Sequence, residues 1–220
     1  MNIGATVATV MAAFAFFSCN SRQRADTENK KPAINMGHEI YSLYDKKDSL
    51  IRVARVIEKD KNVFELSIYA INANNGYQRL DSVQKLTGVQ AEAAKVQLAS
   101  TFNWTPPAAE PQLFVQIQPG GAKGELDALD LRQEVEQKID NALGDGGLGS
   151  WTAGDLGPGG GNMLFVVTDI NRSMQAILQV LQQYNLENTV RIGKRVMTGE
   201  GDWTYLVIYP TGFSGTFDTR

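Results

Sequence analysis

Hydrophobic and polar residues alternate through residues 50–72, apart from some paired apolar positions and a polar turn at residues 59–62. A period of two is typical of strands in a half-buried antiparallel sheet, so this stretch predicts two strands joined by a turn. Asn74-Asn75-Gly76 predicts a second turn, since Asn-Gly accepts positive φ at both central positions. A third strand through Tyr77 and Leu80 is expected to follow.

A short helix is expected after this sheet. Thr87 and Gln90 have the spacing of a capping box, which predicts that the helix begins at Thr87. Val89, Ala93 and Val96 line one side of it.

A proline-rich segment divides the chain. Residues 105–111 contain three of the seven prolines. Because proline fixes φ and removes an amide donor, neither a helix nor a central strand is expected to pass through them. We interpret residues 37–104 as a small α+β module, residues 105–111 as a linker, and residues 112–220 as a second domain.

The second half predicts strands and helices in alternation. Strands are expected at residues 113–117, 163–167, 190–196 and 205–209. A helix over residues 125–143 has apolar residues spaced four apart: Leu131, Val135, Ile139 and Leu143. A second helix, capped by Asp169, has one apolar stripe formed by Met174, Ile177, Leu178, Leu181 and Tyr184.

The order of these elements predicts a known arrangement. If residues 150–152 add a short strand, the order is that of a ferredoxin-like fold, in which two helices cover one face of an antiparallel sheet. The fold class is therefore α+β, with a ferredoxin-like second domain after a β-rich module.

A short motif supports this assignment. The second half resembles small bacterial ferredoxin-like domains of unassigned function that carry W-T-x-G-D-x-G-x-G-x-x-N. The matching residues here are Trp151, Thr152, Gly154, Asp155, Gly157, Gly159 and Asn162. The resemblance implies the fold and little about activity.

The first nineteen residues predict an export signal. They contain no Lys, Arg, Asp or Glu, and residues 3–17 form a mostly apolar run. This run is short of the ~20 residues that span a bilayer, but it fits the core of a secretory signal. Ser18-Cys19 resembles the end of a bacterial lipoprotein signal, which implies a lipid such as palmitate on Cys19. An ordinary cleaved signal and an intracellular protein with an apolar helix stay open.

Lipidation would place the protein in the cell envelope of a Gram-negative bacterium. Residues 20–36 are polar and of mixed charge, and they are expected to form a flexible tether. Some surface-directed lipoproteins carry acidic residues just after the cysteine, whereas Arg22 and Arg24 stand here, which favours the periplasmic side. The choice between inner and outer membrane stays open.

The composition limits the kinds of ligand and site that the chain can have. The 220 residues have a net charge of −3, from 21 basic and 24 acidic residues, which gives no electrostatic case for nucleic acid. One cysteine and one histidine, Cys19 and His38, exclude an intramolecular disulfide and a multi-cysteine metal site. Gly144–Gly149 matches G-x-G-x-x-G but follows a helix rather than a strand, so we expect no dinucleotide there. No cofactor or metal is expected.

The glycine-rich segment is the candidate binding surface. Glycines let a ligand approach the backbone, and Trp151, Thr152, Asp155 and Asn162 supply a stacking face and polar groups. The alternative interpretation is a long hairpin loop in which Trp151 anchors the core.

The function is inferred by elimination. Without thiol, metal or nucleotide chemistry, a non-catalytic role in binding an envelope protein or peptide is expected. A periplasmic immunity-type toxin inhibitor is one alternative. A carboxylate-based hydrolase is another, since such enzymes need only two acids in a cleft and the sequence offers 24 acids with no way to choose a pair.

Overall fold

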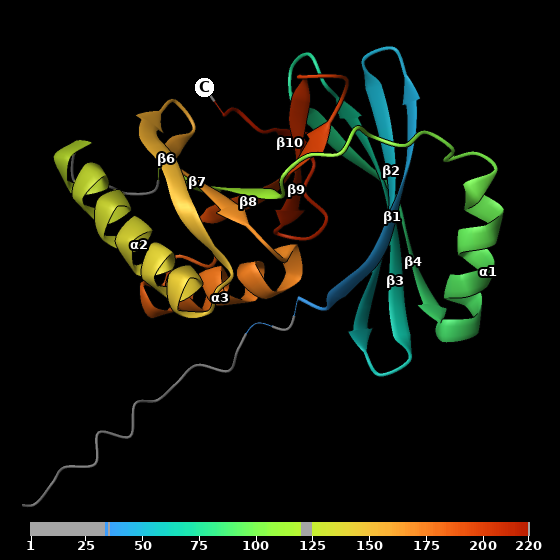
Figure 1. Ribbon diagram of the computed structural model, residues 1–220, viewed down its shortest axis with the longest axis horizontal. Coiled ribbons are helices and arrows are strands. Elements are labelled where there is room, and N and C mark those ends of the chain that lie inside the picture. The colour runs from blue at the N-terminus through green and yellow to red at the C-terminus, as the bar shows by residue number, and fades with distance from the viewer. Residues whose placement is uncertain (1–33, 35, 120–124, 220) are drawn as a thin grey trace, which may run out of the picture. The chain divides into compact units, whose positions relative to one another are not determined.

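The computed structural model describes residue 34 and residues 36–119 and 125–219. Cys19 and nearly all of the proposed tether lie outside these residues. In the described part, ten strands form two antiparallel sheets of five strands each, accompanied by three helices (Figure 1). The chain is therefore of the α+β class, as its sequence predicts.

The first sheet contains four long strands and one short strand from the end of the chain. Its order is β1-β2-β3-β4-β10. The bounds are β1 (His38–Lys47), β2 (Leu50–Asp60), β3 (Val63–Asn72), β4 (Tyr77–Thr87) and β10 (Gly215–Thr216). The alternation through residues 50–72 became β2 and β3, and the turn at Asn75-Gly76 precedes β4.

Strand β1 was not expected from the sequence. Its residues are largely half-buried on both faces, so its polar and apolar positions do not alternate cleanly. The hydroxyl of Tyr41 donates to the carbonyl of Ala91 on one side, and Glu39 meets charged side chains on the other. A strand that is covered on both sides by mixed contacts leaves no period-two signal.

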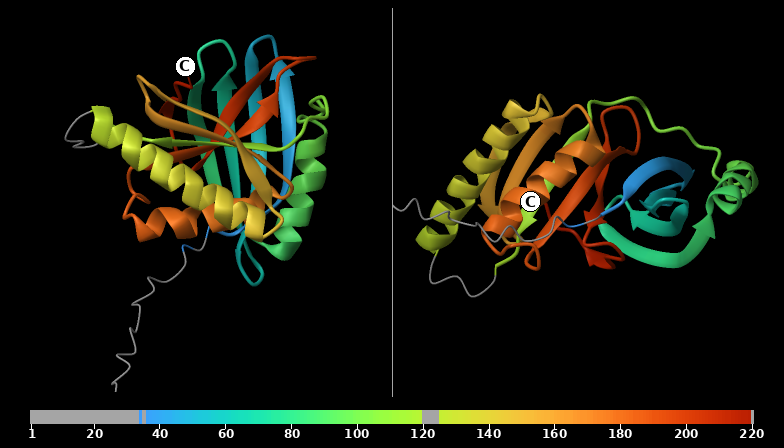
Figure 2. Two further views of the ribbon diagram at one scale, coloured as in Figure 1. Left: turned by 60° about the vertical axis from the view of Figure 1, so that its left-hand side comes forward. Right: turned by 90° about the horizontal axis from the view of Figure 1, so that it is seen from below.

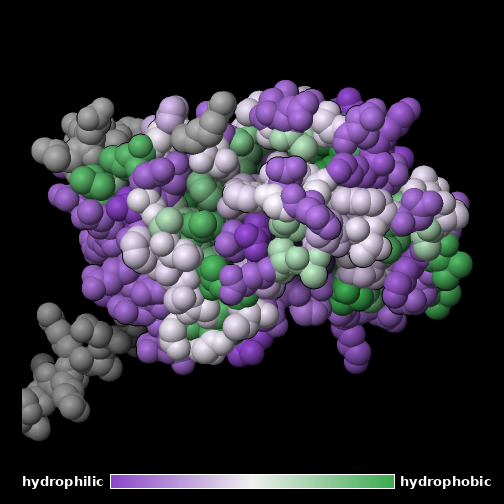
Figure 3. All heavy atoms as spheres, turned by 45° about the horizontal axis from the view of Figure 1, so that its top comes forward, coloured by the Kyte–Doolittle hydropathy of each residue, from purple (hydrophilic) through white to green (hydrophobic). Residues whose placement is uncertain are grey.

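Helix α1 (Gly88–Ala99) begins where the capping box predicts. The side-chain oxygen of Gln90 accepts from the backbone N–H of Thr87 at 2.9 Å. The side that it buries is different from the valine side. Val89 and Val96 are 84% and 76% exposed, and Ala91 is buried instead. Small alanine side chains let the helix approach the sheet closely. On the surface, Figure 3 shows hydrophobic residues gathered over α1 at the right of the view.

The second sheet has the order β6-β7-β5-β8-β9. Helices α2 and α3 lie against one face of it (Figure 2). The strand bounds are β5 (Gln112–Ile117), β6 (Gly149–Gly157), β7 (Gly160–Val167), β8 (Val190–Met197) and β9 (Trp203–Tyr209). The helix bounds are α2 (Glu125–Asp145) and α3 (Ile170–Gln183).

The predicted apolar stripes are the buried sides of the two helices. Val135, Ile139 and Leu143 of α2 are fully buried, and so is most of the α3 stripe. Asp169 caps α3 by accepting the backbone N–H of Arg172 at 3.0 Å. These predictions are confirmed because both helices have a single apolar side.

The glycine-rich segment is not a long loop. Residues 149–157 and 160–167 form the hairpin β6–β7, joined at Pro158-Gly159. The expected short strand at residues 150–152 is therefore part of a nine-residue strand. Its length escaped the sequence because β6 has no buried face and its small residues do not alternate with apolar ones.

The two sheets share a hydrophobic core. Ile51 and Val53 of β2 belong to the same buried cluster as Leu206 and Ile208 of β9. Residues 105–111 form no helix or strand, as their prolines predict. The described residues belong to one compact unit, 32–220. Whether each half folds by itself stays a prediction. No helix in the described part of the chain combines the length and the apolar character needed to cross a membrane.

Candidate functional site: the outer edge of β6

Strand β6 ends the second sheet and is exposed along its length. Among the described residues, β7 is its only partner strand, and every residue from Ser150 to Leu156 is exposed. Trp151 and Leu156 stand out, since these large apolar side chains are 43% and 41% exposed. An edge strand of this kind offers backbone hydrogen-bonding groups to another chain.

The hairpin register tells which groups point outward. Gly157 pairs with Gly160 across a two-residue turn. In such a hairpin the closing pair exchanges ladder hydrogen bonds and the adjacent pair does not. The N–H and C=O of Leu156 therefore point away from β7. Near the other end of the strand, the backbone N–H of Trp151 is taken up by the carboxylate of Asp140 in α2 at 2.7 Å.

Two of the four predicted site residues lie together. The side-chain amide of Asn162 donates to the carboxylate of Asp155 at 2.8 Å. The oxygen of that same amide accepts from Gln116 at 3.0 Å, and Gln116 also donates to the carbonyl of Asp218 at 2.6 Å. Because Gln116 and Asn162 are buried, this ladder across β5, β7 and β6 stabilises one end of the sheet.

The other two residues do not join this ladder. Trp151 lies opposite Phe165, whereas Asp155 lies opposite Asn162. Phe165 and Asn162 are three residues apart on one strand, so their side chains, and those of their partners, lie on opposite faces of the sheet. A bulge between Trp151 and Ala153 shifts the register, and the Thr152 hydroxyl donates to the carbonyl of Leu164 at 3.3 Å.

The glycines of the hairpin make room for the protein's own side chains. A Cβ atom at Gly154 would collide with the ion pair of Arg132 and Glu136 in α2, and one at Gly161 would come within 3.2 Å of Arg132. We expected these glycines to admit a ligand to the backbone. On the α2 side of the hairpin that space is filled, so the accessible part of β6 is its outer edge.

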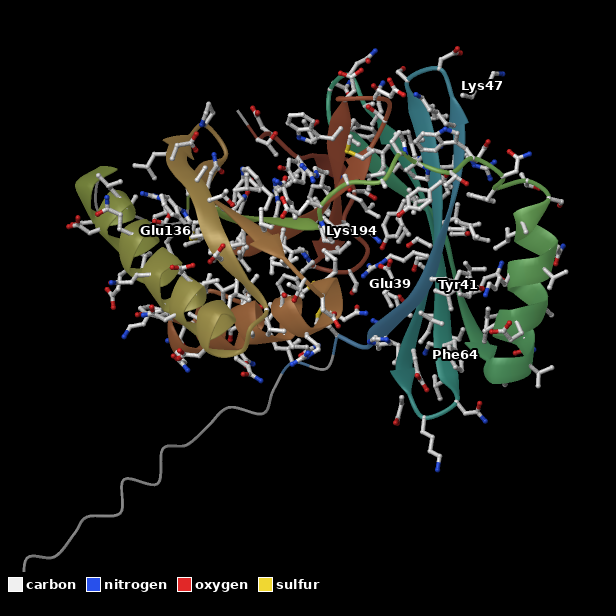
Figure 4. The ribbon with its side chains drawn as sticks, viewed as in Figure 1. Glu39, Tyr41, Lys47, Phe64, Glu136 and Lys194 are labelled. Carbon is white, nitrogen blue, oxygen red and sulfur yellow. The ribbon has the colours of Figure 1, made fainter. Side chains whose placement is uncertain are left out.

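A second polar cluster lies between the two sheets. Glu39 of β1 forms ion pairs with Arg55 of β2 and Lys194 of β8, and all three side chains are largely buried (Figure 4). Burial alone would raise the pKa of Glu39, but the positive charges of Lys194 and Arg55 outweigh it and lower the pKa from 4.5 to about 2. The carboxylate is therefore ionised at neutral pH and holds β1 against β8.

In the described ranges, no group of three or more His, Cys, Asp or Glu residues lies close enough to hold a metal ion. Lipidation of Cys19 concerns a residue outside the described part.

Sequence reasoning missed the residues that hold the hairpin in place. Gln116 stands in the apolar run Leu113–Ile117, and a glutamine inside a buried strand is a signal for a buried polar contact. Arg132 carries no such signal, because a charged residue on a helix is usually solvated. Its role depends on two glycines that are more than twenty residues away.

No protein-family model, curated protein or solved structure matches this chain.

Proposed function

We propose that this chain is a lipid-anchored bacterial envelope protein that binds an extended peptide segment of another protein along the outer edge of β6. The observation that carries the proposal is the exposed edge strand itself, with Trp151 and Leu156 exposed on it. A bound segment would continue the sheet beyond β6 through backbone hydrogen bonds.

The side chains of β6 support a peptide rather than a small molecule as ligand. Trp151 and Leu156 flank the edge, and Asp155 lies on the opposite face from Trp151. In strand addition the backbone groups supply affinity and alternate side chains supply selectivity. An apolar residue of the bound segment would contact Leu156, and a polar or basic one would face Asp155.

The remaining parts of the proposal come from the sequence. A lipid on Cys19 would attach the protein to a membrane, with the periplasmic side favoured, and residues 20–36 would tether the folded part. We further infer a ferredoxin-like arrangement for the second sheet with α2 and α3, extended by β9. The strand order β6-β7-β5-β8, with two helices on one face, supports it.

A matched pair of variants tests the edge. Leu156→Pro replaces the isobutyl side chain by the proline ring and removes the outward N–H. Leu156→Ala shortens the side chain and keeps the N–H. Proline is tolerated on edge strands where the N–H faces solvent, so both variants should fold. Their thermal unfolding is compared first.

The binding experiment uses the full-length lipidated chain as bait in detergent-solubilised envelopes, with captured proteins crosslinked at β6. We expect one stoichiometric partner that Leu156→Ala retains in part and Leu156→Pro loses. Equal capture of the partner by both variants would refute the proposal that it binds along the outer edge of β6. If the captured partner is a toxin whose activity the chain abolishes, the partner class is that of an immunity protein.

A further inference from the structure

A cavity lies on the side of the molecule where the β3–β4 turn, the start of β9 and the C-terminal segment meet. Its volume is about 200 Å³. This is below the range usual for drug-sized ligands, so it suits a single small ring. The lining includes Trp203 and several polar side chains, one of them a carboxyl group: Asn74, Asn75, Thr216, Asp218 and Thr219.

The aromatic wall of the cavity is exposed to solvent. Trp203 is 53% exposed, the most of any tryptophan in the described residues. Trp203 begins β9, and Tyr205 of the same strand lies in the buried cluster of Phe114, Val207 and Phe217. The strand that carries Trp203 is thus anchored in the core, while a large part of the apolar surface of the ring stays open to solvent. An indole face that is open to solvent beside a cavity can stack on an apolar face of a ligand.

The polar wall is built by the backbone. The N–H of Phe217 donates to the carbonyl of Gly76 at 3.3 Å, which joins the C-terminal segment to the turn. A Cβ at Gly76 would come within 2.8 Å of the Phe217 carbonyl, and its φ is +66°, so only glycine allows this approach. The side-chain oxygen of Asn75 accepts from Tyr77 at 3.0 Å, which leaves its amide nitrogen as a donor for another partner.

The chemistry of this lining selects a ligand class. Two amides and three threonine hydroxyls can donate and accept, and a carboxylate can accept, while none of the described lining residues is a lysine or arginine. An anion would find no counter-charge among these described lining residues. A ligand with many hydroxyl groups and one apolar ring face would match both walls.

We propose that this cavity binds one pyranose ring of a saccharide, stacked on Trp203 and hydrogen-bonded by Asn74, Asn75 and Asp218. The site is separate from the β6 edge and does not depend on it. A single ring buries little surface, so the dissociation constant for a monosaccharide is expected at about 1–10 mM. A longer saccharide would bind more tightly only if it contacts the rim.

Saturation-transfer NMR with the full-length protein tests the proposal. The probes are the methyl pyranosides of glucose, galactose and N-acetylglucosamine, with tetramethylammonium and inorganic phosphate as a cation and an anion of similar size. The variants are Trp203→Ala, Trp203→Phe and, as the control, Val89→Ala, which removes an exposed apolar side chain of α1 away from both proposed sites.

We expect wild type, Trp203→Phe and Val89→Ala to bind at least one pyranoside, and Trp203→Ala to bind it about tenfold more weakly. Chemical-shift changes at Asn75 and Thr219 of the wild-type protein should accompany binding, which keeps the test valid if Trp203→Ala does not fold. Absence of binding by every pyranoside would overturn the proposal. So would preferential binding of tetramethylammonium or phosphate, or pyranoside binding that survives in folded Trp203→Ala.

Discussion

The side-chain amide of Gln78 occupies the outer edge of β9 as a strand residue would. Its nitrogen donates to the carbonyl of Tyr205 at 2.8 Å, and its oxygen accepts from the N–H of Val207 at 2.9 Å. Gln78 is completely buried. One side chain of the first sheet therefore closes the edge of the second sheet, while at the opposite edge no strand of the described residues pairs with the outer side of β6.

Replacing Gln78 should weaken the contact between the sheets. Gln78→Met keeps the approximate volume but leaves two buried backbone groups unpaired, at about 1–3 kcal/mol each in the free energy of unfolding. Chemical denaturation measures this loss. Gln84→Met, at an exposed position of the same strand, is the control and should change stability by less than about 0.5 kcal/mol. Equal effects of the two variants would show that Gln78 does not hold the edge.

The charge cluster predicts how stability depends on pH. The pKa of Glu39 is 4.5 unfolded and about 2 folded, so its contribution is fully present above pH 4.5 and is lost as pH falls toward about 2. This shift corresponds to about 3 kcal/mol. Glu39→Gln should lower the free energy of unfolding at pH 7 and make it less dependent on pH between those two values. Glu200→Gln, at an exposed position, should keep the slope of wild type.

Two glycines should respond oppositely to alanine. Gly160 has φ +120°, and a Cβ there would collide with the carbonyl of Ile117, so Gly160→Ala should destabilise the hairpin by more than about 2 kcal/mol. Gly144 lies in α2 with open space around it, so Gly144→Ala should be neutral or stabilising by up to about 1 kcal/mol. Thermal unfolding of both variants decides; a harmless Gly160→Ala would contradict the register of the hairpin.

The proposed edge site predicts separable folding and binding. Trp151 and Asp155 are both exposed, and Asp155→Asn keeps an oxygen that can accept from Asn162, so the double variant Trp151→Ala, Asp155→Asn should unfold within about 1 kcal/mol of wild type and lose its peptide partner. Asn162→Ala, in contrast, should lower the free energy of unfolding by about 1–3 kcal/mol, because it breaks the buried ladder to Gln116. A double variant that folds normally and keeps its partner would exclude these side chains from binding.

Lipidation is tested apart from the fold. Cys19→Ala should abolish labelling with palmitate and release the protein from membranes, because no other cysteine exists to carry the lipid. Ser18→Ala keeps a small residue before the cysteine and should label normally. Persistent labelling and membrane partitioning of Cys19→Ala would reject the lipoprotein assignment.

The local pattern of the sequence was sufficient for much of the fold. Alternation through residues 50–72 predicted β2 and β3, the four-residue spacing of Val135, Ile139 and Leu143 predicted the buried side of α2, and Asp169 predicted a helix cap. Each of these features depends on residues within a few positions of one another. Such interactions are set by the backbone period and by hydrogen bonds within one turn.

Only the tertiary structure decided the features whose partners are far apart along the chain. The buried side of α1, the strand character of residues 149–157 and the role of Gln78 each depend on a neighbour that no local period marks. Gln78 and Val207 are 129 residues apart, and Gly154 and Gly161 are explained by the side chains of an ion pair on α2. The sequence determined most of the segments that form strands and helices, whereas packing determined β1, the length of β6, the faces that the elements bury and the edge that stays open.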